Sequence, residues 1–152
     1  MRVLGIDPST TGGYYALLEC KPGGTATLLE KGFVGGSRDE LHASIKELFT
    51  QLKPELVAIE TPEGTPVTNN GMALLNTAAL AGYFEAVALG MDLKAFTVGA
   101  MLWRREMCSK SSPTNAEIHY YYRLLVQDSP KTNEHIRDAA MTGLHAIQKR
   151  FP

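Results

Sequence analysis

The sequence predicts one α/β domain, in which a mixed β-sheet carries helices on both of its faces. Three observations support this prediction. Short apolar runs alternate along the chain with longer segments that have helical periodicity. Two of the runs end in an acidic residue, Asp7 and Glu60, and the last helical segment places His135 and Asp138 on one face. The length of 152 residues is that of a single domain, and the chain contains no repeat or linker that would divide residues 1–152.

The first half of the chain should form a three-stranded meander followed by a helix and a fourth strand. Residues 2–7 are a short apolar run that ends in an acid, a pattern that predicts a buried strand. Residues 14–20 and 25–34 predict two more strands, joined by a Lys-Pro-Gly-Gly turn. Residues 38–52 carry apolar side chains at helical spacing, and the apolar run 56–60 again ends in an acid.

The second half of the chain should be mainly helical. Residues 71–90 are a long and unusually apolar helical segment. Thr114, followed three residues later by Glu117, has the pattern of a capping box and should open another helix. Because the opening meander is antiparallel and the later strands are separated by helices, the sheet should be mixed. The remaining elements are expected as a strand at 93–98 and helices at 99–107, 114–127 and 133–150.

The acidic residues at two strand ends are the first part of a candidate site. In open α/β sheets, functional groups tend to lie beyond the carboxyl ends of the strands. If the strands that carry Asp7 and Glu60 are neighbours, their carboxylates repel each other unless a cation neutralises them. Hard divalent cations such as Mg²⁺ prefer oxygen ligands of this kind. A strand-end acid can also be a solvated terminus or a helix cap, so the prediction depends on the joint pattern.

The last helix supplies the second part of that pattern. His135 and Asp138 are three residues apart and therefore lie on one helical face. Ala139, Thr142 and Ala146 share this face, and their small side chains would let the helix approach the sheet closely. The helix can thus pack on a core and still direct two ligands at a metal site. A separate apolar stripe consists of Ile136, Ala140, Gly143, Leu144 and Ile147.

Composition restricts the class of protein without identifying it. The net charge is −1, so the chain lacks the overall basic excess that many nucleic-acid-binding proteins have. Its second half is mildly basic, because the segment from Lys94 to Arg150 has nine Lys or Arg and five Asp or Glu. Cys20 and Cys108 are too far apart in the sequence for a paired zinc or disulfide motif, which fits a reducing cytoplasm. The opening residues do not resemble a secretory signal, and we expect a cytoplasmic protein without a membrane span.

Three motifs in this order resemble the RuvC family of Holliday junction resolvases. They are VLGIDPS at 3–9, VAIE at 57–60 and HIRDAA at 135–140, and the order of elements is similar along nearly the whole chain. The resemblance implies a ribonuclease-H-like fold with a five-stranded sheet. It also implies an endonuclease that uses Mg²⁺ or Mn²⁺ and acts as a homodimer, placing paired nicks across a four-way DNA junction.

The predicted chemistry is phosphodiester hydrolysis with two metal ions in each active site. Asp7 is the natural bridging ligand, because it lies on the first and central strand. Glu60 would complete the shell of one ion, and Asp138 would complete that of the other. His135 would either bind the second ion or orient the attacking water, and family members carry Asp or His at its position.

Basic side chains near the predicted site are candidates for contacts with DNA phosphates. Such contacts position a duplex without reading its bases. Each of these residues is also reasonable as a solvated surface charge. The candidates are Arg104, Arg105, Lys110 and Lys131.

An aromatic side chain that stacks on DNA bases has to come from outside the loop after Glu60. Relatives often carry a bulky aromatic residue there, whereas residues 61–70 contain no Phe, Tyr or Trp. Tyr14 and Tyr15 are the nearest substitutes in the sequence. Because alternate residues of a strand face opposite ways, at most one of them can point at DNA.

The apolar helix at 71–90 has more apolar surface than one sheet face needs. A helix that is apolar all round is usually buried, and a core position under the sheet would satisfy it. The family resemblance implies a different arrangement, in which one face packs on the sheet and the other forms a twofold homodimer interface.

Other classes of protein remain open from the residues alone. Residues 5–12 also resemble the first phosphate loop of the actin and sugar-kinase superfamily, although those proteins need two such domains around the nucleotide. A nuclease of related fold that acts on ribosomal RNA is a second alternative. A non-catalytic nucleic-acid-binding scaffold is a third, and the complete acidic set argues against it.

Overall fold

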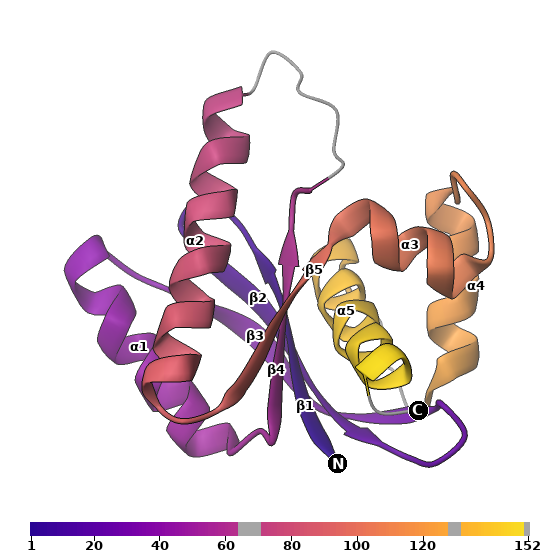
Figure 1. Cartoon of the computed structure of the whole chain (residues 1–152), viewed down its shortest axis with the longest axis horizontal. Helices are drawn as coiled ribbons and strands as arrows, with labels where there is room; N and C mark the ends of the chain where they lie inside the picture. Colours follow the sequence, from indigo (N-terminus) through magenta and orange to yellow (C-terminus); the bar gives the residue numbers. More distant parts are fainter. Residues whose placement is uncertain (64–70, 128–131, 151–152) are drawn as a thin grey trace.

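A six-stranded mixed sheet forms the middle layer of the fold (Figure 1). The computed structural model describes residues 1–63, 71–127 and 132–150. The strand order is β5-β4-β1-β2-β3-β6, with β1, β2 and β3 antiparallel and the other pairings parallel. The strands are β1 (Arg2–Pro8), β2 (Gly12–Cys20), β3 (Ala26–Gly35), β4 (Leu56–Thr61), β5 (Lys94–Gly99) and β6 (Val126–Gln127).

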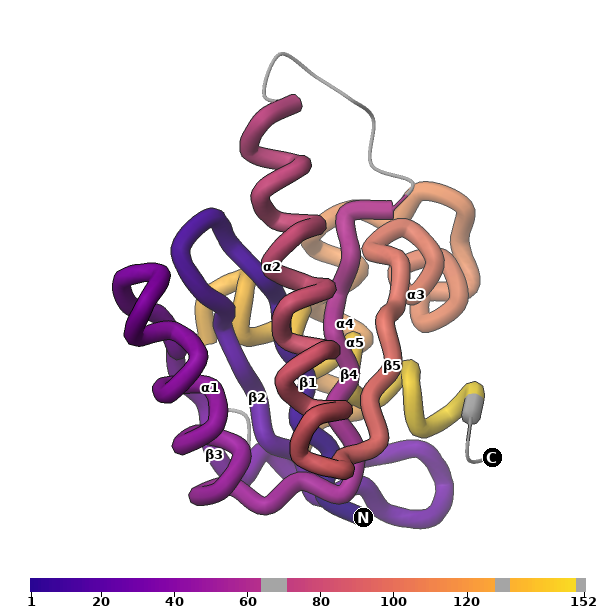
Figure 2. The backbone as a smooth tube through the Cα atoms, turned by 60° about the vertical axis from the view of Figure 1, so that its left-hand side comes forward, coloured from indigo at the N-terminus to yellow at the C-terminus, as the bar shows by residue number. Residues whose placement is uncertain are grey.

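Helices cover both faces of the sheet, as predicted. Helices α1 and α2 lie against one face, and α3, α4 and α5 lie against the other (Figure 1), an arrangement that the turned view in Figure 2 also shows. The N-terminal end of α2 extends beyond the ends of the strands (Figure 1). The helices are α1 (Arg38–Leu52), α2 (Gly71–Gly90), α3 (Ala100–Cys108), α4 (Asn115–Leu125) and α5 (Glu134–Arg150).

The expected elements lie within two residues of their predicted bounds, with one correction. The prediction of five strands is wrong, because Val126 and Gln127 form the short strand β6 beside β3. The sequence had assigned these two residues to the end of a helix. The helix instead ends at Leu125, and its capping box is confirmed, with Thr114 and Glu117 exchanging hydrogen bonds.

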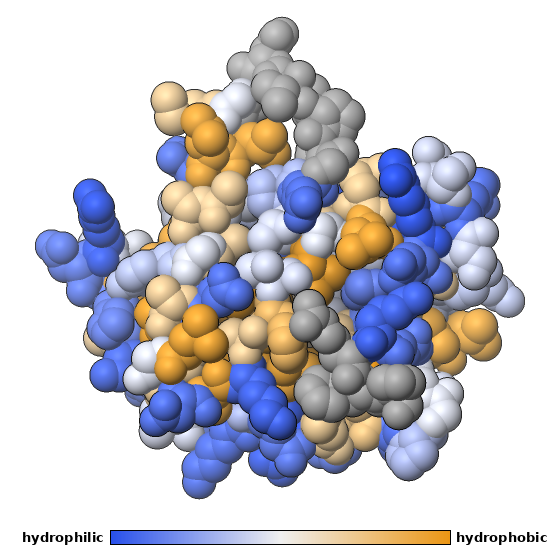
Figure 3. All heavy atoms as spheres, in the orientation of Figure 1, coloured by the Kyte–Doolittle hydropathy of each residue, from blue (hydrophilic) through white to orange (hydrophobic). Residues whose placement is uncertain are grey.

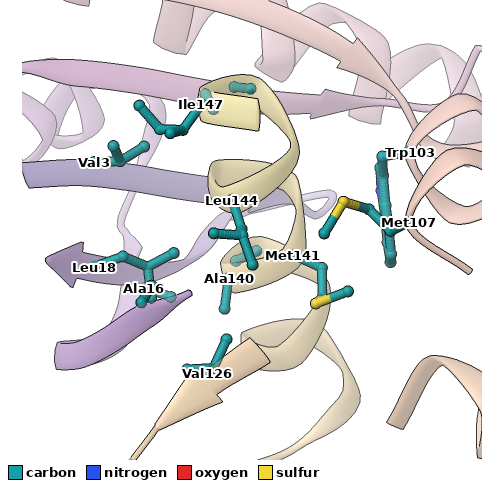
Figure 4. Packing of buried hydrophobic residues seen from close by; sticks show 14 of the residues in the cluster. Val3, Ala16, Leu18, Trp103, Met107, Val126, Ala140, Met141, Leu144 and Ile147 are labelled. Carbon is teal, nitrogen blue, oxygen red and sulfur yellow. The ribbon is translucent and has the colours of Figure 1, made fainter. Parts of the chain in front are cut away.

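The alternation of side chains along the strands divides the core into two clusters. Val3 of β1 points to the side of α3, α4 and α5, whereas Leu4 and Ile6 point to the side of α1 and α2. Figure 4 shows the first cluster, in which α5 fills the space between the sheet and α3. Because both faces of β1 are buried, any polar group at its end is held in a largely water-free environment.

Close contact between α5 and β1 depends on small residues. A Cβ atom added to Gly5 would clash with the carbonyl oxygen of Ala139 and would approach the backbone nitrogen of Gly143. Ala139, Thr142 and Ala146 are all buried on this helix. The prediction that small side chains allow α5 to lie close to the sheet is therefore confirmed, and this packing sets how near α5 comes to the end of β1.

Helix α2 leaves much of its apolar surface exposed. Ala81, Phe84, Val87 and Ala88 are its buried residues, while apolar side chains at its N-terminal end are largely exposed, as Figure 3 shows. By length and composition, α2 is also the single helix in the described residues that could cross a membrane, and 22% of that segment is buried. A single helix of this kind is weak evidence for a membrane span. Core helices of soluble proteins pass the same test, so the test alone does not place α2 in a membrane.

Candidate active site

The parallel pairing of β1 and β4 brings two acidic residues side by side. Ile6 pairs with Ile59, and each is followed by an acid, Asp7 or Glu60. Both acids are 8% exposed. The two strands are neighbours, so the two carboxylates lie together at the carboxyl end of the sheet.

Helix α5 adds the other two predicted residues. Nδ1 of His135 lies 2.8 Å from Oδ2 of Asp7, and the two groups are hydrogen-bonded. Asp138, one helical turn further on, is 7% exposed. Because α5 packs tightly on β1, these side chains reach the strand ends from the first turns of the helix. The structure thus brings all four predicted site residues into one cluster, and their roles stay predictions.

Burial and mutual repulsion make this cluster electrostatically costly. Burial raises the pKa of Asp7, and the hydrogen bond with His135 opposes that increase. Burial and the neighbouring charge of Asp7 raise the pKa of Glu60 to about 7. Asp138 adds a third negative charge that acts on both groups. A site with three buried carboxylates favours a bound cation, because a cation removes the repulsion among them.

Two arginines neutralise part of this charge. Arg137, which is buried, donates from Nε and Nη2 to Oδ1 of Asp138 at 2.8 and 2.7 Å. Arg104 of α3 donates from Nη2 to the other oxygen, Oδ2, at 2.9 Å. The same Nη2 atom lies 3.6 Å from Oε1 of Glu60. Arg104 therefore connects Asp138 with Glu60, a relationship that was not expected from the sequence.

Two neutral donors hold the remaining oxygen of Glu60. The indole Nε1 of Trp103 donates to Oε2 at 2.7 Å, and the hydroxyl of Thr142 donates to the same atom at 3.3 Å. Sequence reasoning did not identify either residue as part of the site. Two signals were present: Trp103 is the sole tryptophan of the chain and precedes Arg104, and Thr142 lies on the face of α5 that carries Asp138.

The donor set of the cluster suits a hard divalent cation. Asp7, Glu60 and Asp138 offer carboxylate oxygens, which Mg²⁺ and Mn²⁺ prefer, and His135 offers an imidazole nitrogen. Among the described residues, however, no three acidic, His or Cys side chains are already arranged as a metal site. The guanidinium of Arg104 contacts two of the carboxylates, Glu60 and Asp138.

The four basic residues predicted to contact DNA have different environments. Arg104 is part of the acidic cluster. Arg105 is exposed and donates from Nε to the carbonyl oxygen of Ser111. Lys110 is half exposed and forms an ion pair with Glu117. Lys131 lies outside the described residues. Phosphate contacts by these side chains stay predictions.

The neighbouring tyrosines of β2 lie on opposite faces of the sheet, as strand geometry requires. Tyr14 pairs with Asp7 across the sheet and stacks on the ring of His135, with ring centroids 4.5 Å apart and planes 10° apart. On its other side it contacts Phe33 edge to face. Tyr15 packs instead against the cluster beneath α1 and α2. Of the two, Tyr14 alone adjoins the acidic cluster. The predicted loop at 61–70 lies mostly outside the described residues.

Comparisons with known proteins agree with the resemblance seen in the sequence. No protein-family model matches the chain. The crossover junction endodeoxyribonucleases RuvC of Serratia proteamaculans (strain 568) and Sodalis glossinidius (strain morsitans) are each 24% identical over 156 residues. These alignments cover 96% of this chain and 88% of each relative.

Solved structures with a similar fold include several Holliday junction resolvases. RuvC of T. thermophilus in complex with a Holliday junction substrate has a TM-score of 0.79 at 20% identity, covering 95% of this chain and 92% of that protein. The yeast mitochondrial Holliday junction resolvase has a TM-score of 0.63 at 11% identity, covering 99% of this chain and 81% of that protein. The fowlpox virus resolvase in complex with Holliday junction DNA has a TM-score of 0.55 at 13% identity, and the alignment covers both chains fully. The fold of this chain is therefore the ribonuclease-H-like fold of RuvC, and the resemblance predicted from the three motifs is confirmed.

Proposed function

We propose that this chain is a structure-selective DNA endonuclease that resolves Holliday junctions by hydrolysing phosphodiester bonds. The observation that carries the proposal is the cluster of three buried carboxylates, Asp7, Glu60 and Asp138, at the carboxyl end of a RuvC-like sheet. Buried acids that repel one another reduce stability, and they are explained most simply by a function that needs them. Cys20 and Cys108 are buried and unpaired, in keeping with a proposed cytoplasmic location.

The same three carboxylates and His135 would hold two divalent cations, Mg²⁺ or Mn²⁺. When bound, such ions lower the pKa of a water molecule and neutralise charge on the scissile phosphate. The protein contributes the positions of the ligands. Trp103 and Thr142 hold Oε2 of Glu60, and Arg137 holds Oδ1 of Asp138, so one oxygen of each carboxylate is fixed by a protein donor.

His135 has a role that depends on its two ring nitrogens. Nδ1 is engaged by Asp7, and the ring is held flat against Tyr14. The side chain is nevertheless 56% exposed, so its Nε2 atom remains accessible to solvent and to a bound nucleic acid. His135 would either bind the second ion or orient the attacking water, with the carboxylate of Asp7 fixing the orientation of its ring.

Four basic side chains are proposed to contact the DNA substrate. Arg104, Arg105 and Lys110 come from α3 and the turn that follows it, and each would contact phosphate oxygens. Lys131 is the fourth proposed contact. Because phosphate contacts carry most of the binding free energy, they bring DNA to the carboxylates without choosing a sequence.

The enzyme is proposed to act as a homodimer through α2. Met72 is 71% exposed and Leu75 is 65% exposed on the part of the helix that extends past the sheet. Two copies of this surface related by a twofold axis would cover each other. The same axis would place two active sites in one assembly, as paired nicks across a junction require.

One experiment tests the proposed activity directly. The protein is incubated with Mg²⁺ and end-labelled four-way junction, linear duplex, single-stranded DNA and RNA of matched sequence. Paired symmetrical nicks in the junction, absent in EDTA and absent from an Asp7→Asn variant, would support the proposal. Cleavage of RNA but no junction would contradict it and favour the alternative of an RNA-processing nuclease.

A further inference from the structure

Arg104 contacts two of the carboxylates that are proposed to hold the divalent cations, Glu60 and Asp138. Its Nη2 atom is 2.9 Å from Oδ2 of Asp138 and 3.6 Å from Oε1 of Glu60. These are the two carboxylate oxygens that Trp103, Thr142 and Arg137 leave unoccupied. A guanidinium is a permanent cation, so it screens the two acids in the absence of any ion.

Arg137 and Arg104 neutralise the same acid but differ in how firmly they are held. The side chain of Arg137 is 5% exposed, donates twice to Oδ1 of Asp138 and also reaches Asn115. The side chain of Arg104 is 27% exposed and donates from one nitrogen, while its Nε atom is buried without a hydrogen-bond partner. A buried donor without a partner is a cost that a different position of the side chain could remove.

We propose that Arg104 is a resident cation of the active site, which divalent metal ions have to displace before they can use Glu60 and Asp138 as ligands. This inference rests on the proposed function and adds a regulatory element to it. Arg137 stays in place and orients Asp138, whereas the guanidinium of Arg104 is exchanged for the ion. The metal affinity of the protein alone is consequently lower than its carboxylates would otherwise give.

The exchange couples metal-ion binding to the position of the Arg104 guanidinium. A metal ion bound to either of these oxygens would lie close to the guanidinium, and like charges repel at such distances. Once displaced, the guanidinium is available for an anion, and its planar fork suits phosphate oxygens. An anionic group that binds Arg104 away from the carboxylates would thus strengthen metal-ion binding. By linkage, the metal ion would strengthen the binding of that anionic group to Arg104 by the same factor.

The test is a calorimetric titration of Mn²⁺ into metal-free protein, with no nucleic acid present. Arg104→Gln should bind Mn²⁺ about tenfold or more tightly than the wild type, because a charge-assisted hydrogen bond no longer has to be broken. The Mn²⁺ affinity of Arg104→Lys should lie between those of the wild type and Arg104→Gln, since an ammonium is a cation without the planar fork. Arg123→Gln, at an exposed arginine of α4, makes the same change in net charge and should bind like the wild type.

Thermal melts provide the second readout and guard against misfolding. Without metal ions, Arg104→Gln should have a lower melting temperature than the wild type, because the carboxylates lose a counter-charge. Mn²⁺ should raise the melting temperature of Arg104→Gln by more than it raises that of the wild type. If Arg104→Gln does not fold, the Mn²⁺ titration of Arg104→Lys tests the proposal instead. Equal, weaker or absent Mn²⁺ binding by the Arg104 variants would overturn the proposal. A failure of the proposed nuclease activity would appear in the cleavage assay and would leave these ion titrations unaffected.

Discussion

The indole of Trp103 and the carboxylate of Glu60 are joined by a 2.7 Å hydrogen bond inside the protein. Trp103 is fully buried, so its N–H group has no alternative partner in water. The bond fixes the orientation of Glu60 and opposes the increase in its pKa that burial causes. We therefore expect Trp103 to act as a positioning residue for Glu60.

Replacing Trp103 by Phe should reduce cleavage by about tenfold or more, as loss of an outer hydrogen bond to a metal ligand commonly does. The pKa of Glu60 should increase further, so the acid limb of the pH–rate profile should move to higher pH. A purely structural defect would not move that limb. Phe49→Leu, a buried substitution in the other core cluster, is the control. An unchanged profile in the Trp103 variant would show that the bond has no role in the chemistry.

Asp7→Asn should abolish cleavage and leave folding and DNA binding largely intact. Asparagine fills the same space, but it cannot supply the charged bridging oxygen. Removing the charge also relieves the repulsion that raises the pKa of Glu60. Cleavage assays with Mg²⁺, gel shifts and thermal melts on the same preparation measure the three effects. Cleavage at close to the wild-type rate would mean that the proposed active site is wrong.

His135→Ala should lose most of the activity, whereas His135→Asp should keep a measurable part. Either His or Asp can offer a ligand atom at this helical position, and Ala offers none. The Asp variant should also shift its preference from Mn²⁺ toward Mg²⁺, because imidazole suits the softer ion better. Initial rates with each metal measure both effects. An Ala variant as active as the wild type with both metals would identify His135 as a bystander.

Glu60→Gln should stabilise the metal-free protein at alkaline pH. The pKa of Glu60 is raised to about 7 in the folded state, against about 4.3 in an unfolded chain. A carboxyl of this kind favours folding while protonated. Its contribution is therefore fully present below about pH 4 and is lost as the pH rises through about 7. At about pH 8 in EDTA, the Gln variant should have a free energy of unfolding about 1–3 kcal/mol higher than the wild type.

Urea denaturation of both proteins at acid and alkaline pH measures this difference. At about pH 4.5 the two should unfold nearly alike, because Glu60 is then protonated in the folded state. Added Mn²⁺ should stabilise the wild type more than the variant. A variant that is less stable than the wild type at alkaline pH would show that the pairing with Arg104 outweighs burial.

Leu75→Glu should convert the proposed dimer to a monomer, because it places a charge in the exposed apolar surface of α2. Leu124→Glu, at a similarly exposed leucine of α4, should leave the oligomeric state unchanged. Sedimentation velocity at micromolar concentration distinguishes the two states. A wild-type protein that sediments as a monomer and still makes paired nicks would contradict the proposed interface.

The sequence by itself determined the order of elements and indicated the four acidic or imidazole side chains of the candidate site. Apolar periodicity is a local property, so it located the strands and helices to within two residues. Strand ends are local too, which is why Asp7 and Glu60 could be identified as functional candidates. The boundary at Val126 was wrong, because the short strand β6 forms only when β3 is present to pair with it.

Only the tertiary structure decided which side chains surround those carboxylates. Trp103 and Arg104 lie more than forty residues from Glu60 in the sequence, and no spacing connects them. They reach it because α3 packs against α5, and α5 approaches β1 closely enough that Gly5 tolerates no side chain. Hydrogen bonds and ion pairs depend on distances of a few ångströms, and packing sets those distances. Arg104, which the sequence suggested as a phosphate contact, is for this reason found between two of the acids.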